Sequence, residues 1–313
     1  MNILLLYDLG EQADNEIRKL LPDARVVRSQ HDDPDRQNKI ADAEMICGWP
    51  GVDQLAAADK LRWLHLPSAG ATRYARALPE SVLLTNSSGT MGTAMADHVF
   101  AMILAMARDV PAMVKGQLAR SWRTPARNRF ELTGQTMGIV GLGDIGLQTA
   151  RRAKGFDMRV IANKRTPGQK PDCVDQLLGP DGLGRILAES DHIVVTLPGT
   201  KHTDGLISRE LIEQIKPEAY IYNVGRGSTI DQPAMIDALQ SGRLAGAGLD
   251  VFDPEPLPAD SPLWTMDNVL ISPHCAGSTP HHRSRCAELF LANLRHLIAG
   301  EELTNLVDRD LEY

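Results

Sequence analysis

The sequence has few aromatic residues, few cysteines and no excess of positive charge. Phe, Trp and Tyr make up 4% of its 313 residues, which is low for an all-β sandwich or an RNA-stacking platform. Lys and Arg number 33 against 40 Asp and Glu, and the net charge of −7 argues against a nucleic-acid-binding protein. The four cysteines are scattered without a C-x-x-C pair. We therefore expect no disulfide framework and no metal site, and a reducing, cytoplasmic location.

Long hydrophobic runs are also missing. No apolar stretch approaches the roughly 18 residues that span a membrane, so we expect no membrane partner. The first apolar run, Ile3–Tyr7, has no basic residue before it and acidic residues after it, which favours a first β-strand over a signal peptide. At about 150 residues per domain, the length predicts two domains.

Short apolar strands alternate with amphipathic stretches in the first third of the chain. The helical stretches expected there are Ala13–Leu21, Val52–Ala58 and Ala71–Leu78. The strands expected around them are Ile3–Tyr7, Arg25–Arg28, Glu44–Cys47, Arg62–Leu66 and Val82–Thr85. This alternation predicts an α/β fold with a parallel sheet covered by helices on both faces.

The pattern changes in the middle of the chain and then resumes. A helical segment at 93–120, interrupted by Pro111, and a basic segment at 121–130 form either a connection that includes a dimerisation arm or a plain surface linker. The last helix, Pro280–Ala299, should end at Gly300. Between them the expected strands are Thr136–Gly141, Met158–Asn163, His192–Leu197, Ala219–Val224, Ala245–Asp250 and Val269–Ser272.

A glycine-rich turn opens this second α/β run. Gly141, Gly143 and Gly146 form G-x-G-x-x-G between an apolar strand and a helical stretch. In a dinucleotide-binding fold the first glycine allows a tight turn, the second lets the backbone approach the pyrophosphate, and the third lets helix and strand pack closely. A strand precedes the turn, and a helix and a second strand follow it. We therefore favour a dinucleotide site over a purely structural turn.

The end of the second strand indicates which dinucleotide binds. NAD-binding folds place an acidic residue there for the ribose hydroxyls, whereas this chain has Asn163, Lys164, Arg165 and Thr166. Lysine and arginine suit a 2′-phosphate by charge and hydrogen bonding. We predict NADP(H) as the preferred cofactor, with NAD(H) as the alternative if these residues form an ordinary exposed loop.

Three later residues form a set suited to hydride-transfer chemistry. Arg226 lies beside two glycines after a predicted strand, where its planar guanidinium can hold a carboxylate by two contacts. His274 is the candidate general acid or base, because imidazoles titrate near neutrality, and Glu255 would orient it. Each residue type alone is more often structural, so the prediction depends on the three occurring together.

Four motifs resemble the D-isomer-specific 2-hydroxyacid dehydrogenases in sequence, order and spacing, and the resemblance extends over nearly the whole chain. They are Gly141-Leu-Gly-Asp-Ile-Gly146, Asn223-Val-Gly-Arg-Gly227, Asp250-Val-Phe-Asp-Pro-Glu-Pro256 and Pro273-His-Cys-Ala-Gly277. The ending, 307–313, resembles those of the short bacterial glyoxylate/hydroxypyruvate reductases. Asp97 departs from the glutamate more common in the family, and we expect no C-terminal regulatory extension of the kind found in many phosphoglycerate dehydrogenases.

The resemblance implies a fold and a set of site residues. It implies a Rossmann-type dinucleotide domain at 99–279, inserted into a flavodoxin-like substrate domain at 1–98 and 280–313, both of them doubly wound parallel sheets. Arg226, Glu255 and His274 would be catalytic, and Arg226, His274 and the loop residues Ser68, Ala69 and Gly70 would bind the substrate. The expected cofactor contacts are Gly141, Gly143, Asp144, Ile145, Gly146, Asn163, Lys164, Arg165, Thr166, Leu197, Pro198, Asp250 and Met95.

The family implies reduction of a small 2-oxo acid to the D-2-hydroxy acid, with His274 supplying the proton. Glyoxylate and hydroxypyruvate are the expected substrates. A different acid, such as 3-phosphoglycerate, formate or phosphite, remains an alternative, as does a non-catalytic NAD(H)-sensing corepressor. Family likeness also favours a homodimer formed through the region 102–130.

Overall fold

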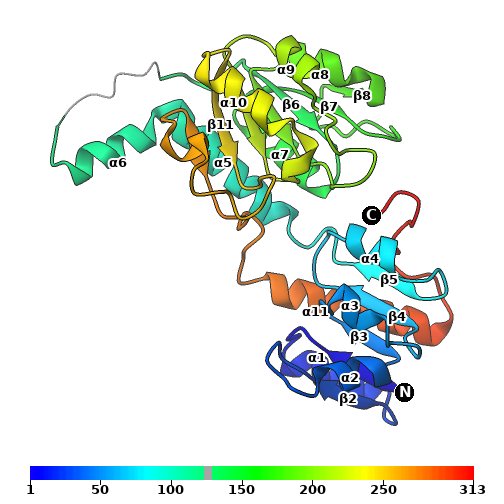
Figure 1. The fold of residues 1–313 in the computed structure, drawn as a ribbon. Coiled ribbons are helices and arrows are strands. Elements are labelled where there is room, and N and C mark those ends of the chain that lie inside the picture. The colour runs from blue at the N-terminus through cyan, green and yellow to red at the C-terminus, as the bar shows by residue number, and fades with distance from the viewer. Residues whose placement is uncertain (123–128) are drawn as a thin grey trace. The chain divides into compact units, whose positions relative to one another are not determined.

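The computed structural model describes residues 1–122 and 129–313, and the chain divides into two compact units (Figure 1). The first unit comprises 1–90 and 279–313, and the second comprises 91–278. In sequence, the second unit is therefore inserted into the first. Residues 123–128 of the basic segment predicted at 121–130 lie outside the described residues.

The first unit is built on a five-stranded parallel sheet with the strand order β2-β1-β3-β4-β5. Its strands are β1 Asn2–Leu5, β2 Arg25–Arg28, β3 Met45–Cys47, β4 Trp63–Leu66 and β5 Leu83–Asn86. Its helices are α1 Glu11–Leu20, α2 Arg36–Asp42, α3 Val52–Leu55, α4 Thr72–Ala77 and α11 His282–Ala299. Alternate residues of β4 enter two separate apolar clusters, so both faces of the sheet are buried, as parallel sheets require.

Helix α11 returns to the first unit after the whole of the second. Phe290 of α11 stacks on Trp63 of β4 with ring centroids 5.0 Å apart, and both side chains are buried. The helix ends as predicted at Gly300, which adopts a left-handed conformation with φ 72°. The first unit is therefore completed by residues distant in sequence from its sheet.

The second unit is built on a seven-stranded parallel sheet with the order β12-β11-β10-β9-β6-β7-β8. Its strands are β6 Thr136–Val140, β7 Arg159–Asn163, β8 Gln176–Leu178, β9 His192–Val195, β10 Ala219–Asn223, β11 Leu244–Leu249 and β12 Val269–Ile271. Its α-helices are α5 Gly92–Arg108, α6 Val110–Leu118, α7 Asp144–Gly155, α8 Leu183–Glu189, α9 Arg209–Gln214 and α10 Gln232–Gln240. Short 3-10 turns are formed by Pro180–Gly182, Gly227–Thr229 and Pro262–Thr265.

The strand orders confirm the predicted fold class. The first sheet has the 2-1-3-4-5 order of flavodoxin-like folds, and the second has a Rossmann-type order. In the second sheet all strands are parallel, and the order in which strands are added reverses between β6 and β9. In such sheets, ligands bind beyond the carboxyl ends of the strands near the reversal. A ligand of the second unit is therefore expected at the loops after β6, β9, β10, β11 and β12.

The helical segment predicted at 93–120 is two helices. Asp109 between α5 and α6 adopts a left-handed conformation with φ 55°, which ends the first helix, and Pro111 lies in the first turn of the second. The domain boundary that we placed after residue 98 falls inside α5. The whole helix belongs to the second unit because its buried residues, such as Val99 and Ile103, enter the same core as Ala150 of α7.

Candidate active site

The glycine-rich turn between β6 and α7 is held in place by polar contacts. Gly141 has φ 97°, a conformation that favours glycine, and its N–H donates to Asn163 Oδ1 at 3.0 Å. Its carbonyl accepts a hydrogen bond from Thr196 Oγ1 at 2.6 Å. Asn163 thus takes up the strand-end position where NAD-binding folds carry an acid, and its side chain bonds the turn itself.

The other two glycines of the motif leave room around the helix start. A Cβ on Gly146 would lie 2.6 Å from the Gly141 carbonyl oxygen, whereas one on Gly143 would meet nothing within 4 Å. Among the described residues, no protein group accepts a hydrogen bond from the amides of Asp144, Ile145 or Gly146. Free amides at the start of a 12-residue helix, with an open backbone beside them, suit a pyrophosphate.

The basic residues predicted to choose the cofactor follow β7 directly. Lys164, Arg165 and Thr166 are exposed. The backbone N–H of Lys164 donates to the Leu178 carbonyl at 3.0 Å, which fixes the start of the loop while leaving the side chains at the surface. No acidic residue occupies this strand end.

Three further predicted cofactor contacts belong to the second unit. The Leu197 side chain packs over Gly141, since an added Cβ there would lie 2.9 Å from Leu197 Cδ2. The Pro198 carbonyl accepts from Thr203 Oγ1 at 2.6 Å. Met95 of α5 is partly buried against the core of the second unit, close in sequence to Gly92, where an added Cβ would collide with the Asp144 carboxylate.

Arg226 lies in the loop after β10. Its Nη1 donates to the Gly225 carbonyl at 2.7 Å, and its own carbonyl accepts from Asn223 Nδ2 at 2.9 Å and Thr229 Oγ1 at 2.6 Å. Burial lowers the pKa of the guanidinium, and the negative charge of Glu255 opposes that effect. A partly desolvated guanidinium interacts more strongly with an anion than one in water.

Glu255 and His274 are in direct contact. Glu255 Oε2 lies 2.8 Å from His274 Nδ1, and Glu255 Oε1 accepts from the Phe252 N–H at 3.0 Å. The carboxylate therefore bridges its own loop and the imidazole, and it favours a proton on Nδ1. The side chains of both residues remain partly exposed, so the Nε2 edge of the imidazole can reach a ligand.

Asp250 is buried, and its carboxylate holds the loop that carries His274. Oδ1 accepts from Ser272 Oγ at 2.5 Å and from the Cys275 N–H at 2.9 Å, and Oδ2 accepts from the Ala276 N–H at 3.0 Å. We expected this side chain to face the cofactor. Three of the roughly four acceptor positions on the carboxylate are already used within the protein.

The first unit holds the predicted substrate loop. Among the described residues, no protein group accepts from the amides of Ala69 or Gly70. Trp49 Nε1 donates to Ser68 Oγ at 3.1 Å, and the Tyr7 ring meets the Trp49 ring edge-on at 5.3 Å. Because the indole occupies only an acceptor position on Ser68, the serine hydroxyl proton stays available.

Sequence reasoning missed several residues that hold this site. Asn223 and Thr229 fix the Arg226 loop, and Ser272 and His98 belong to the network around Asp250. Asn223 and Ser272 stand in or next to the motifs we quoted, so proximity to the catalytic residues was the available signal. His98 lies outside the four motifs and is distant in sequence from Ser272 and Asp250, so sequence reasoning did not connect it with them.

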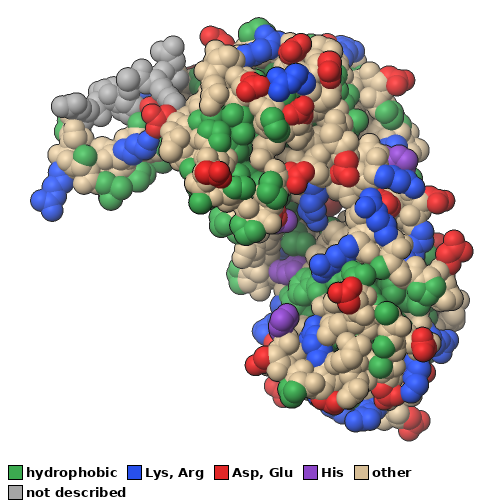
Figure 2. All heavy atoms as spheres, viewed as in Figure 1, with side chains coloured by type: hydrophobic (Ala, Val, Ile, Leu, Met, Phe, Trp, Pro, Cys, Tyr) green, Lys and Arg blue, Asp and Glu red, His purple; other side chains and the backbone are tan. Residues whose placement is uncertain are grey.

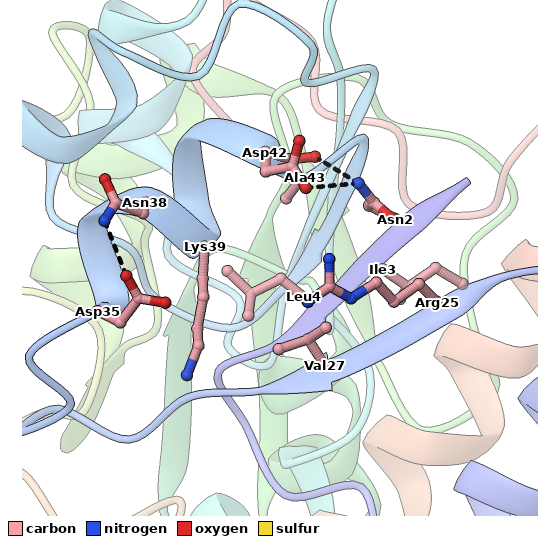
Figure 3. Close-up of a pocket in the computed structure, with 10 residues that line it drawn as sticks. All are labelled: Asn2, Ile3, Leu4, Arg25, Val27, Asp35, Asn38, Lys39, Asp42 and Ala43. Carbon is pink, nitrogen blue, oxygen red and sulfur yellow. Dashed lines mark hydrogen bonds between the residues drawn. The ribbon is translucent and has the colours of Figure 1, made fainter.

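Other features of the described chain do not compete with this site. No cluster of His, Cys, Asp and Glu in the described residues could hold a metal ion, and no described helix is long and apolar enough to cross a membrane. A cavity of about 210 Å³ in the first unit lies beside β1, β2 and α2 (Figure 3). Among its polar lining residues, Asn38 pairs with Asp35 and Asn2 pairs with Asp42.

Comparisons with known proteins agree on one family. Residues 100–276 match the family model described as "D-isomer specific 2-hydroxyacid dehydrogenase, NAD binding domain". The chain is 35% identical over 264 residues to a glyoxylate reductase of Korarchaeum cryptofilum, covering 82% of this chain and 78% of that protein. It is 37% identical over 278 residues to a glyoxylate/hydroxypyruvate reductase B of Pectobacterium carotovorum, covering 86% and 87%.

A solved structure extends the likeness to the whole fold. A D-isomer specific 2-hydroxyacid dehydrogenase from Xanthobacter autotrophicus, in complex with NADPH and MES, is 30% identical with a TM-score of 0.84. The match covers 100% of this chain and 99% of that one.

Proposed function

The chain belongs to the D-isomer specific 2-hydroxyacid dehydrogenase family, and from this premise we propose that it reduces a small 2-oxo acid to the D-2-hydroxy acid. Glyoxylate and hydroxypyruvate are the proposed substrates, because the two curated relatives described above carry those names. The observation that carries the proposal is the contact of 2.8 Å between Glu255 Oε2 and His274 Nδ1 in the loops after β11 and β12.

Each of the three catalytic candidates has a distinct task. In its doubly protonated form, His274 gives the Nε2 proton to the carbonyl oxygen of the substrate as the carbonyl carbon accepts a hydride. The imidazole N–H bond and the carbonyl π bond break, and an O–H bond and a C–H bond form. Glu255 holds the imidazole through Nδ1 and leaves Nε2 to face the substrate. Arg226 pairs with the substrate carboxylate and polarises the carbonyl group.

The cofactor that fits the second unit is a nicotinamide dinucleotide. When bound, NADPH supplies the hydride. The unpaired amides of Asp144, Ile145 and Gly146 would hold its pyrophosphate, and Gly143 would let the backbone approach. Leu197, Pro198, Met95 and the free acceptor position of Asp250 would contact the rest of the molecule. We accordingly assign 91–278 as the dinucleotide domain.

We propose NADPH over NADH because of the residues after β7. Lys164, Arg165 and Thr166 are exposed there, and Asn163 occupies the position of the acid that would bind unmodified ribose. A 2′-phosphate gains charge-assisted hydrogen bonds from such residues. NADH would bind in the same place with fewer contacts.

The first unit is proposed to act as the substrate domain. The amides of Ala69 and Gly70 and the hydroxyl of Ser68 are three donors with no acceptor among the described residues, and they come from consecutive residues of one loop. Such a group of donors suits a carboxylate.

The proposal is tested by steady-state kinetics with NADPH and a panel of acids. We expect turnover of glyoxylate and hydroxypyruvate, with pyruvate and phenylpyruvate reporting how large a substituent the enzyme accepts. Oxidation of 3-phosphoglycerate, formate or phosphite with NADP⁺ or NAD⁺ would assign a different acid to the same fold. Cofactor binding without turnover of any acid would contradict an enzymatic role.

We also propose that the chain forms a homodimer through the α6 arm. Helix α6 extends away from the sheet of the second unit (Figure 1), and apolar side chains are exposed along the arm (Figure 2). Val114 and Met113 are more than two-fifths exposed, and Leu118 is 80% exposed. Scattered apolar residues are normal on a surface, but a run of them on one protruding helix is typical of an interface. Light scattering of the wild type and of Leu118→Glu tests this, with a dimer and a weakened dimer expected, whereas a monomeric wild type would contradict it.

A further inference from the structure

We propose that His98 of α5 is a positioning residue for His274 and acts through Ser272 and Asp250. This inference rests on the proposed function, because it assigns His274 as the proton donor. Its basis is a chain of hydrogen bonds in the second unit. His98 Nε2 lies 2.9 Å from Ser272 Oγ, and Ser272 Oγ lies 2.5 Å from Asp250 Oδ1.

The loop that carries His274 needs support. His274 has φ 50°, a left-handed conformation that non-glycine residues seldom adopt without compensating contacts. Its N–H donates to the Asp250 carbonyl at 2.9 Å, and the Asp250 carboxylate accepts the N–H groups of Cys275 and Ala276. Asp250 therefore holds the backbone of His274 and of the two residues that follow it, and the orientation of its carboxylate affects where the loop lies.

The direction of each hydrogen bond follows from the available protons. The Asp250 carboxylate is buried and only accepts, so the single hydroxyl proton of Ser272 points to Oδ1. Ser272 then has no proton to give to His98, so His98 Nε2 must carry a hydrogen and donate it to Ser272 Oγ. His98 thus fixes the serine, the serine fixes the carboxylate, and the carboxylate fixes the His274 loop.

The position of His98 makes this role specific. It lies in the second turn of α5, a helix whose apolar side is packed in the core of the second unit, and its own side chain is a quarter exposed. His98 Nε2 also lies 3.9 Å from Asp250 Oδ1, so the imidazole is adjacent to both members of the network. A rigid helix is a suitable anchor for a loop whose imidazole must be placed accurately.

A first experiment compares two substitutions of His98. His98→Gln retains an N–H near the position of Nε2, whereas His98→Phe keeps a planar ring and removes the donor. We expect His98→Phe to lower kcat about tenfold or more with little change in KM for NADPH, and His98→Gln to restore most of the loss. His31→Phe, at an exposed loop of the first unit, is the control.

A double variant separates positioning from general destabilisation. Because His98 acts through His274, His98→Phe should cause no further loss in a His274→Ala background. Additive losses would overturn the proposal, as would equal kcat values for the Phe variant and the wild type. A merely structural role would lower the amount of folded protein without this non-additivity.

A measurement without substrate distinguishes this inference from the proposed function. The ¹⁵N chemical shifts of the His274 ring, assigned by their absence in His274→Ala, report the ring's tautomer and its contact with Glu255. We expect them to change in His98→Phe and in Ser272→Ala, and to stay near wild type in His98→Gln and Ser272→Thr. Unchanged shifts in the first pair would overturn the inference, whereas a wild type inactive on every acid would overturn the proposed function alone.

Discussion

The two units are both parallel α/β sheets, yet they present different chemistry beyond the carboxyl ends of their strands. In the second unit the loops after β10, β11 and β12 carry Arg226, Glu255 and His274, which are charged or titratable side chains. In the first unit the loop after β4 carries Ser68, Ala69 and Gly70, which offer two amides and a hydroxyl. The same architecture can therefore suit proton transfer in one unit and, in the other unit, binding of a carboxylate by uncharged donors. We expect changes at His274 and the residues that position it to alter kcat, and changes in the first unit to alter KM for the 2-oxo acid.

Histidine placement shows the same contrast. Each unit buries one histidine in a central strand, His65 in β4 and His192 in β9, whereas His274 stands in a loop with its ring half exposed. Burial lowers the pKa of His65 to about 3, and burial lowers the pKa of His192 to about 4. The buried pair is structural because it stays neutral, whereas the exposed imidazole of His274 is the one that we propose as the proton donor.

The largest expected effect is the loss of the proton donor. His274→Ala should lower kcat by about 10²- to 10⁴-fold, because general acid catalysis contributes that much, with little change in NADPH affinity. Stopped-flow or steady-state assays measure kcat, and fluorescence titration measures binding. Cys275→Ala, at the neighbouring exposed position, is the matched control and should keep near wild-type turnover. An unchanged kcat in His274→Ala would remove the contrast between the units.

The second prediction concerns acid stability, in which the two units should behave alike. A histidine whose pKa is lowered by folding binds protons more tightly when unfolded, so stability falls as pH drops below about 6.5. By pH 4 each histidine should cost on the order of 3 kcal/mol of unfolding free energy. Urea denaturation between pH 7 and pH 4 measures this.

A substitution in each unit assigns the acid sensitivity. His65→Asn and His192→Asn remove the titrating group, so each variant, although less stable at pH 7, should lose less stability between pH 7 and pH 4 than the wild type. His65 bonds Thr85 and Ser87, and His192 bonds Gln135, so some loss at neutral pH follows from these contacts. Equal acid losses in the wild type and both variants would show that other groups are responsible.

In the second unit, the sequence predicted features that depend on neighbouring residues better than contacts between distant segments. The glycine turn, the Arg226 loop and the His274 loop each follow an apolar strand, so local patterning placed them at the edge of a sheet. The contact between Glu255 and His274 was predictable only as a pair in neighbouring loops. The link from His98 to Asp250 was not, because it joins a helix to a loop that no periodic pattern connects.

Two of the elements that sequence reasoning did not assign, α2 and β8, share a physical cause. Helix α2 is mostly polar with one fully buried residue, Ile40, and β8 has three residues and no fully buried side chain. Such segments have almost no hydrophobic periodicity and are fixed by tertiary contacts. The domain boundary lies after residue 90, and we placed it after residue 98 for a related reason. Nothing in the apolar pattern of α5 shows which core the helix enters.

The third prediction tests cofactor choice within the second unit. The double variant Lys164→Ala/Arg165→Ala should raise KM for NADPH by about tenfold to a hundredfold and leave KM for NADH nearly unchanged, because charge-assisted hydrogen bonds to a 2′-phosphate are lost. Arg185→Ala removes a comparable exposed charge that pairs with Glu189 on α8, and it should change neither value. Equal effects on both cofactors would mean that these residues do not contact the 2′-phosphate.

The smallest expected effect tests the first unit. Trp49→Phe keeps an aromatic ring against Tyr7 but removes the indole N–H that donates to Ser68 Oγ. A single neutral hydrogen bond contributes about 0.5–1.5 kcal/mol, so KM for the 2-oxo acid should rise by about two- to tenfold while kcat stays at its wild-type value. Trp264→Phe in the second unit removes a similar indole hydrogen bond, to the Pro258 carbonyl, and should change neither constant. If Trp49→Phe lowers kcat and leaves KM unchanged, the first unit takes part in the chemical step, and the division between the two units fails.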